Sequence, residues 1–448
     1  MKYTFENGIG EIYARAYAVR LDIGTIAVTV GDCEMVRLDV RSGLDVACGE
    51  ADTRPDDSAP PTDLSYEATD DAVTFTWSGT SSLWERKEYV LVCREDAAEY
   101  FVRVHGAGAV MSVNYFSGNM TEPCHGSDYD FSEGYTPVVS LDGSEPYTFA
   151  PIRDFRRFSY LTVPPMFVYA FRAEEDARLA FGLVARPGEH NFTDFAYRTT
   201  MHRWGAKFWL STDQSGHTEV SREWRTPSVF IYRADSYEDA VEKYSARYFE
   251  LGYAAPHKEE LRPRFWYGPI ACGWLEQLAS MYAGGYGLVA GSRQELYEGF
   301  VGRLHGRGIE PKILIIDDKW QKEYGTAHED TEKWPDLAGF IRRMRRDHGI
   351  HTFMWYKMWD SEGVPEEYCV FDERENRYVV DPTNPGYLKI LRDAIHYIIS
   401  DDEGCLGADG LKIDFAFWQP VGRKARSYSG KYGVELFREL VSRIREYM

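Results

Sequence analysis

Lys412 and Asp414 stand two residues apart in the apolar stretch GLKIDF, residues 410–415 of the 448-residue sequence. In a β-strand, residues i and i+2 point to the same face, so these two charged side chains project together. Two charges on one face of a buried strand cost free energy unless they pair or act on another group. The stretch alone leaves two interpretations open: a structural ion pair, or part of a site.

Polar and aromatic residues also follow three other predicted strands. They are Cys272 to Trp274, Asp317 to Trp320, and Trp355 to Lys357 with Trp359. Parallel α/β folds gather their active groups at the carboxyl ends of strands. An Asp-Asp pair alone usually marks a turn or a helix N-cap, but the Lys-x-Asp at the end of another strand, Lys412 to Asp414, favours a site here. Among the tryptophans, we expect Trp320 and Trp355 to form ligand platforms.

The elements that position these residues alternate between strand and helix from about residue 263. Apolar strands are predicted at 265–272, 312–317, 350–356 and 410–415, and a helical period follows each. The capping box Ser292-x-x-Glu295 predicts where the first helix begins, and Gly349 predicts where the second ends. Four such units predict a parallel sheet with covered faces, either the first half of a (β/α)8 TIM barrel or a small open sheet.

The chain before this region has the period of two that is typical of strands. In AVTFTWSG, at residues 72–79, apolar and polar residues alternate, and Gly, Pro, Asp and Ser clusters separate similar runs. This predicts a large all-β sandwich. From residue 237 the period becomes helical. We therefore expect a β-sandwich domain at 1–236, a helical linker at 237–262 and an α/β domain at 263–448.

Composition narrows the function classes. The formal net charge of −20 argues against nucleic acid or an anionic membrane as a partner. No apolar signal segment opens the chain and no apolar run is long enough to span a membrane. Seven scattered cysteines without a C-x-x-C motif predict free thiols and a cytoplasmic protein. Aromatic residues make up 15% of the chain, which leans weakly towards carbohydrate as the ligand.

Four ordered motifs carry a family resemblance. ILIIDDKWQ, WPDLAGFIRRMRRDHGIHTFMWY, DPTNP and LKIDF resemble the melibiase-type retaining α-glycosidases, the clan of α-galactosidases and related α-glucosidases in glycoside hydrolase families 36 and 31. The likeness covers about residues 260 to 420. It implies an N-terminal β-supersandwich, followed by the first half of a (β/α)8 catalytic barrel.

The resemblance also implies roles for the strand-end residues. Asp414 resembles the catalytic nucleophile, and Lys412 resembles the lysine that binds sugar hydroxyls. Asp317 and Asp318 resemble the carboxylate pair that hydrogen-bonds the terminal sugar, and Trp320 resembles the adjacent wall. The implied reaction is hydrolysis of terminal α-linked sugars through a covalent glycosyl-Asp intermediate.

Two positions depart from the family. Lys319 stands where the family usually has Gly, which implies a smaller or differently tuned pocket beside the Asp pair. The family's general acid/base lies on a later strand, so we expect the distal half of the barrel to be missing from this chain. Neither Asp360 nor Glu362 is assigned to that role.

Alternatives to the α-galactosidase-like hydrolase remain. They are a transglycosylase of the same clan and a non-catalytic carbohydrate-binding protein. The partner is an oligosaccharide or α-glycoside, and a homo-oligomer stays open. We predict no cofactor and no metal: the glycines at 284–291 lack the phosphate-loop ending, and no H-E-x-x-H motif is present.

Overall fold

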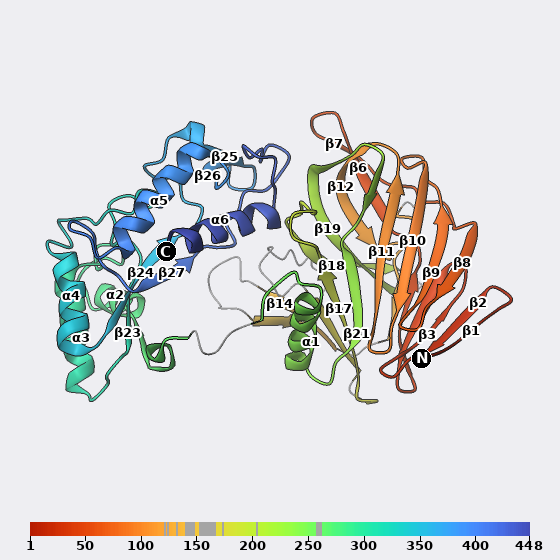
Figure 1. Ribbon diagram of the computed structural model, residues 1–448, viewed down its shortest axis with the longest axis horizontal. Coiled ribbons are helices and arrows are strands. Elements are labelled where there is room, and N and C mark those ends of the chain that lie inside the picture. The colour runs from red at the N-terminus through yellow and green to blue at the C-terminus, as the bar shows by residue number, and fades with distance from the viewer. Residues whose placement is uncertain are drawn as a thin grey trace. The chain divides into compact units, whose positions relative to one another are not determined.

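The computed structural model describes residues 1–120, 122, 125–130, 133–138, 148–151, 167–172, 174–202, 205–256 and 262–448. The chain divides into two compact units (Figure 1). The first unit comprises Met1–Pro256 with Tyr432–Glu435, and the second comprises His257–Lys431 with Leu436–Met448. Part of the predicted linker, residues 257–261, lies outside the described residues, as does Cys124.

Antiparallel sheets make up most of the first unit. One sheet has the strand order β1-β2-β3-β4-β5-β13, with β1 Lys2–Glu6, β2 Ile9–Tyr13, β3 Ala18–Leu21, β4 Thr25–Val30, β5 Cys33–Asp39 and β13 Asp128–Tyr129. A second has the order β18-β19-β12-β6-β7, with β18 Phe195–His202, β19 Gly205–Val220, β12 Gly108–Tyr115, β6 Gly43–Cys48 and β7 Asp52–Arg54.

The largest described sheet has the order β15-β14-β16-β17-β21-β11-β10-β9-β8, and β20 also pairs with β11. Its strands are β15 Thr148–Pro151, β14 Glu133–Val138, β16 Phe167–Arg172, β17 Ala177–Val184, β21 Ser228–Arg233, β11 Ala97–His105, β10 Arg86–Cys93, β9 Val73–Gly79, β8 Asp63–Ala68 and β20 Glu223–Arg225. These sheets confirm the prediction, made from the period of two, that the first part of the chain is rich in β-sheet.

Strand β9 shows why the pattern gives this fold. Val73, Phe75 and Trp77 are buried, whereas the residues between them are half-buried, as alternation in a strand requires. Burying each large apolar side chain stabilises the fold by about 1.5–3 kcal/mol. The indole Nε1 of Trp77 donates to the Asp22 carbonyl at 2.7 Å, so its polar atom is satisfied inside the core.

Helix α1, Tyr237–Glu250, follows the sheets and belongs to the first unit. Its N-cap is Ser236, whose hydroxyl accepts a hydrogen bond from the Asp239 amide. The buried Tyr244 hydroxyl donates to the Leu183 carbonyl of β17 at 2.6 Å. The change to a helical period at residue 237 is therefore confirmed.

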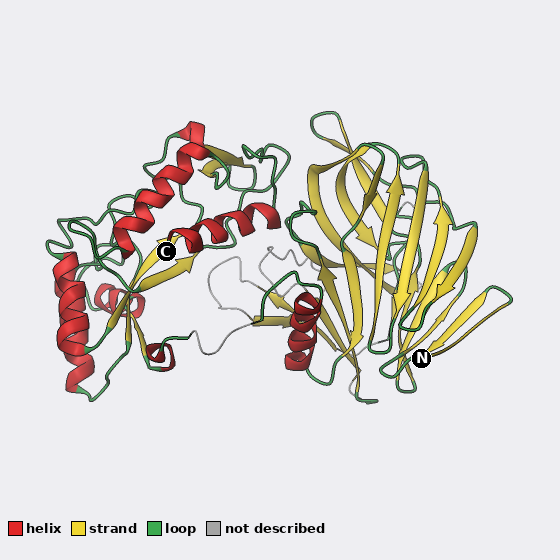
Figure 2. Cartoon of the chain, viewed as in Figure 1, coloured by secondary structure: helices red, strands yellow, loops and turns green. Residues whose placement is uncertain are grey.

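A parallel sheet lies at the centre of the second unit, with the strand order β22-β23-β24-β27. The strands are β22 Ile270–Cys272, β23 Ile313–Ile316, β24 His351–Lys357 and β27 Gly410–Asp414. The helices are α2 Trp274–Tyr282, α3 Gln294–Gly306, α4 Leu337–His348, α5 Pro385–Ile399 and α6 Val434–Tyr447 (Figure 2). The four predicted strands and their parallel pairing are confirmed, but the first is shorter than predicted, because Arg264–Tyr267 forms a 3-10 turn instead. Their continuation as half of a barrel stays a prediction.

Of the two helix boundaries predicted in the second unit, one is confirmed and one is not. Gly349 ends α4 with φ 63°, a left-handed conformation that glycine adopts without a steric penalty, as predicted. The prediction that the capping box at Ser292 begins the helix was wrong. Arg293 is the N-cap of α3, and its side chain makes no cap bond. Ser292 does not cap the helix because its buried hydroxyl donates to the Asp317 carbonyl at 3.2 Å.

A helix, a hairpin and two short turns of the second unit were not predicted from the sequence. Helix α2 lies between β22 and α3, before the capping box that was expected to begin the first helix. A hairpin of β25 Cys369–Asp372 and β26 Arg377–Val380 lies between β24 and α5. Short 3-10 turns occur at Arg264–Tyr267 and Glu366–Tyr368.

Candidate active site

The carboxyl ends of the parallel strands bring most of the predicted site residues to one edge of the sheet. Asp317 and Asp318 follow β23 directly. Trp355 lies near the end of β24, and Lys412 and Asp414 lie at the end of β27. In the parallel register Trp355 stands beside Lys412, so the two strands present their polar groups side by side.

Lys412 forms its closest ion pair with Asp317. Its Nζ lies 2.7 Å from Asp317 Oδ2 and 3.7 Å from Asp414 Oδ2. Asp317 is only 2% exposed, and the Cys272 thiol also donates to its Oδ2 at 3.0 Å. The lysine is thus held between a buried carboxylate and a more open one.

Burial and charge act against each other on Lys412. Burial alone would lower the lysine's pKa, but the hydrogen bond and charge of Asp317 outweigh it, so the pKa is raised. Burial and then the same carboxylate raise the pKa of Cys272 to about 11. The site therefore holds a charged lysine and a neutral thiol at pH 7, and Cys272 is a hydrogen-bond donor rather than a nucleophile.

Asp414 is oriented by its neighbours yet open to solvent. Trp355 Nε1 donates to its Oδ2 at 3.0 Å, and the Phe415 amide donates to its Oδ1 at 2.8 Å. The side chain is 39% exposed. Phe415 has φ 56°, a left-handed conformation that is strained for an aromatic residue. Asp414 thus has the fixed direction and the access that an attacking carboxylate needs.

Asp318 faces a different partner from Asp317. The Tyr324 hydroxyl donates to Asp318 Oδ1 at 2.8 Å, and the Asp318 amide donates to Asp317 Oδ1 at 2.9 Å. Burial raises the pKa of Asp318, although the bond from Tyr324 opposes this. The adjacent carboxylates therefore differ in their surroundings: Asp317 is paired with a lysine, whereas Asp318 is paired with a phenol.

Two lysines contact the ring of Tyr324. Lys319 Nζ lies 3.9 Å and Lys357 Nζ 4.2 Å from the ring centroid, within the range of a cation–π interaction. Lys319 also pairs with Glu362 at 2.8 Å, and Lys357 pairs with Asp360 at 2.8 Å. Each carboxylate that was left unassigned by the sequence analysis therefore has a cationic partner.

Trp320 and Trp355, the predicted platforms, are both buried, at 0% and 1% exposed. The Trp320 ring packs in the core cluster of the second unit, and its Nε1 donates to the Trp355 carbonyl at 2.8 Å. A fully covered ring cannot stack on a sugar in this arrangement. The indoles instead support the site: Trp320 fixes the backbone of β24, and Trp355 orients Asp414.

Tyr297 is a supporting residue that the sequence analysis did not assign to the site. It is buried on α3, and its hydroxyl accepts from the Asp317 amide at 2.8 Å and donates to Gln277 Oε1 at 2.8 Å. Helical periodicity could have placed Tyr297 on the inward face with Phe300 and Val301. Tyr324 lies outside the described helices and strands, where no periodic signal exists.

The described residues include no group of three or more His, Cys, Asp or Glu arranged to hold a metal ion. In the same part of the chain, no helix has the length and apolar character needed to cross a membrane. What the edge of the sheet does offer is a carboxylate open to solvent, a lysine and a phenol-bonded carboxylate. These groups suit hydrogen bonding to hydroxyls and nucleophilic attack.

Comparison with known proteins supports the fold. No protein-family model matches the sequence, and no curated protein matches it. A family 36 α-galactosidase of Geobacillus stearothermophilus, solved with raffinose, is 11% identical with a TM-score of 0.51, over 97% of this chain and 70% of that one. An α-N-acetylgalactosaminidase of Bifidobacterium bifidum is 10% identical with a TM-score of 0.55, over 100% and 75%.

A family 97 glycoside hydrolase of Pseudoalteromonas, solved with panose, is 10% identical with a TM-score of 0.50, over 100% of this chain and 65% of that one. At such identities the likeness is one of fold. The chain therefore shares the fold of glycoside hydrolases of the α-glycosidase type, and the resemblance inferred from the four motifs is confirmed at that level.

Proposed function

We propose that the second unit carries the active site of a retaining glycoside hydrolase that acts on terminal α-linked sugars, with α-galactosides as the first substrates to test. The observation that carries the proposal is the placement of Asp414: it is open to solvent and held by two donors, and the charged Lys412 lies 3.7 Å away. The fold shared with α-glycosidases is consistent with it.

In the proposed reaction, an Asp414 oxygen attacks the anomeric carbon and forms a glycosyl-Asp ester. The glycosidic bond breaks, and the leaving oxygen takes a proton from a second carboxyl group. Water then attacks the anomeric carbon and gives its proton to that second group, and the bond from this carbon to the Asp414 oxygen breaks, which releases the sugar and the carboxylate. Retention requires the two carboxyl groups about 5–5.5 Å apart.

Lys412, Asp317 and Asp318 form the proposed subsite for sugar hydroxyls. Lys412 can donate to a hydroxyl while it stays paired with Asp317, because an ammonium has three donors. Asp318 can accept from a hydroxyl at its half-buried carboxylate. Asp317 is nearly covered, so its proposed part is mainly to hold the ammonium in place. Trp320 and Trp355 act through the positions of β24 and Asp414.

The domains take matching roles in this proposal. Residues 1–236 form the β-sandwich domain, 237–262 the helical connection and 263–448 the first half of the catalytic barrel. In the transglycosylase alternative, a sugar hydroxyl replaces water in the second step. Products formed with excess acceptor sugar distinguish the two.

The test compares full-length protein with its Asp414→Asn variant on an aryl α-galactoside. We expect kcat to fall by about 10⁴-fold or more, because the covalent step is lost. A mechanism-based fluorinated galactosyl fluoride should label Asp414 in the parent protein. Asp393→Asn, on an exposed side chain of α5, is the control and should leave turnover unchanged. Turnover by the Asp414→Asn variant, or labelling of a residue other than Asp414 by the fluoride, would refute the assignment.

A further inference from the structure

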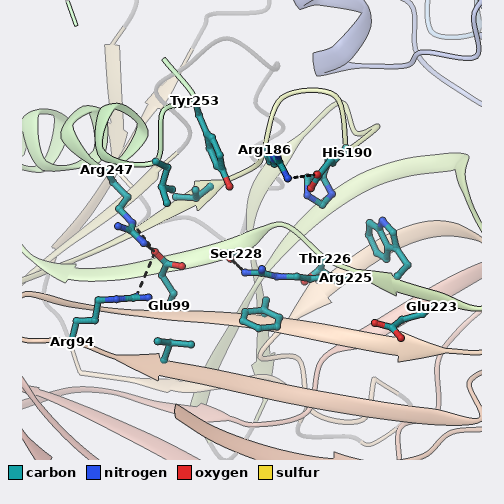
Figure 3. Close-up of a pocket in the computed structure, with 16 residues that line it drawn as sticks. Arg94, Glu99, Arg186, His190, Glu223, Arg225, Thr226, Ser228, Arg247 and Tyr253 are labelled. Carbon is teal, nitrogen blue, oxygen red and sulfur yellow. Dashed lines mark hydrogen bonds and ion pairs between the residues drawn. The ribbon is translucent and has the colours of Figure 1, made fainter. Parts of the chain in front are cut away.

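A second candidate site lies in the first unit. A pocket of about 710 Å³ is bounded by β11, β17, β20 and β21 and by residues at the end of α1 (Figure 3). A volume of several hundred Å³ accommodates a small organic ligand. The residues that matter for its chemistry are arginines, glutamates, one histidine and three aromatic side chains.

The charges of this pocket do not cancel. It is lined by four arginines and three glutamates. Arg247 donates to Glu99 at 2.7 Å, Arg94 lies 3.9 Å from the same carboxylate, and Arg186 pairs with Glu189 at 2.9 Å. The third glutamate, Glu223, pairs with Arg103 at 3.5 Å, and Arg103 does not line the pocket.

Arg225 is the fourth arginine that lines the pocket. Within the described residues, no carboxylate lies at ion-pair distance from it. Its guanidinium donates to Ser228 Oγ at 2.9 Å and lies over the Phe101 ring, 3.7 Å from the centroid. These contacts fix the plane of the group but use few of its five donors. In a chain with a net charge of −20, an arginine fixed in this way is suited to a planar or tetrahedral anion.

His190 contributes a buried ring nitrogen without a hydrogen-bond partner among the described residues. The residue is 8% exposed and lines the pocket, and the nitrogen is its Nδ1. Burial, aided by the charge of Arg225, lowers its pKa to about 4, so the ring is neutral at pH 7. Buried polar atoms are nearly always hydrogen-bonded, so Nδ1 is suited to a ligand hydroxyl.

Rings and further acceptors surround these two groups. Trp224 lies against His190 with the centroids 6.0 Å apart, and Figure 3 shows Tyr253 extending its hydroxyl into the pocket. The solvent-exposed carboxylates of Glu189 and Glu223 can accept from hydroxyls. The lining is therefore polar and partly aromatic, which suits a hydroxylated ring better than an apolar one.

We propose that this pocket binds a small hydroxylated organic anion, an acidic sugar or a sugar phosphate. The carboxylate or phosphate group lies against Arg225, and a ring hydroxyl bonds to His190 Nδ1. Carboxylate and phosphate share the paired oxygens that a guanidinium recognises. The proposal concerns binding only and does not depend on catalysis in the second unit.

Isothermal titration calorimetry of the full-length chain tests it. The probes are glucuronate, glucose 6-phosphate, inorganic phosphate and neutral glucose. At least one sugar anion should bind about tenfold or more tightly than glucose and than inorganic phosphate. Using an Asp318→Ala variant as the host separates this site from the proposed active site, because the substitution removes an acceptor of the proposed sugar subsite and should leave binding at the pocket unchanged.

Substitutions locate the binding. Arg225→Met keeps a long unbranched side chain but removes the guanidinium over Phe101, and should weaken anion binding by about tenfold or more. Arg222→Met, at an exposed arginine three residues away that does not line the pocket, should change nothing. His190→Phe should weaken sugar anions but not inorganic phosphate. If Arg225→Met unfolds, Arg225→Lys replaces it and should weaken binding several-fold.

Several outcomes would overturn the proposal: no probe bound by the parent protein, glucose bound as tightly as the anions, inorganic phosphate bound as tightly as the sugar anions, or undiminished affinity in the folded Arg225 variant.

Discussion

Lys412 lies closer to Asp317 than to Asp414, its neighbour two residues along the same strand. Asp317 is 95 residues earlier in the chain and nearly covered, whereas Asp414 is open to solvent. The shared strand face brings the lysine near Asp414, whereas the tertiary fold brings it to Asp317 at the end of β23, with which it pairs more closely. This asymmetry separates a carboxylate that holds the lysine from one that is free to react.

Lys412→Met should destabilise the second unit, because it leaves the Asp317 carboxylate buried beside an apolar side chain. Since Lys412 is about one-third exposed, we expect about 2 kcal/mol rather than the larger cost of breaking a fully buried pair. Urea denaturation measures the change. Adding Asp317→Asn should recover part of the loss, since the unpaired charge is then absent. A double variant less stable than the single one would contradict this account.

Trp355→Phe should lower kcat while leaving KM nearly unchanged. The substitution removes the hydrogen bond to Asp414 but keeps an aromatic ring in the core. Loss of a bond to a charged group is worth about 1.5–3 kcal/mol, which corresponds to roughly a 10- to 100-fold change. Trp334→Phe is the matched control, because Trp334 is equally buried and its Nε1 has no hydrogen-bond partner in the described structure. Equal effects of both substitutions would mean that packing alone matters.

Cys272 should react slowly with iodoacetamide at pH 8. Burial and the Asp317 carboxylate raise its pKa to about 11, so little thiolate is present, whereas Cys48 is exposed and should be alkylated first. Asp317→Asn removes the charge that disfavours the thiolate, so labelling of Cys272 should become faster. Mass spectrometry of the two peptides measures both rates. Unchanged labelling of Cys272 in the variant would show that the carboxylate does not act on the thiol.

The stability of the first unit should depend on His190 below pH 6.5. Its pKa is about 4 in the folded chain and near 6.5 when unfolded, so the unfolded chain binds more protons between these values. The contribution of His190 to the free energy of unfolding is therefore fully present above pH 6.5. It falls on acidification, and about 3 kcal/mol is lost at pH 4 and below. Scanning calorimetry should show a shallower decline in His190→Phe. Parallel curves for the two proteins would contradict the shift.

Sequence patterns predicted the secondary structure well where a period or a cap is local. The alternation around Phe75 predicts a half-buried strand, and Gly349 marks the end of α4. The spacing of Lys412 and Asp414 places both on one strand face. These inferences depend on neighbours within a few residues, and such local signals need no knowledge of the tertiary fold.

The contacts that complete the candidate site were not predictable in the same way. The link from Lys412 to Asp317 depends on strands far apart in sequence. Trp320 was expected to face a ligand, but a strand-end indole can equally turn into the core, and only packing decides this. Ser292 failed as a cap because a backbone carbonyl from another strand end accepts its hydroxyl, which a capping pattern cannot represent.

The left-handed backbone at Phe415 restricts which sequences can carry this arrangement. A position with φ 56° accepts glycine or asparagine. It disfavours valine, isoleucine and threonine, because their branched β-carbon crowds the backbone. Directed evolution of the strand end should therefore leave the position after Asp414 free of β-branched residues, even when a ring is not retained there. That exclusion is also a filter for distant relatives: a Lys-x-Asp followed by valine or isoleucine cannot present its carboxylate through the same backbone turn without added strain.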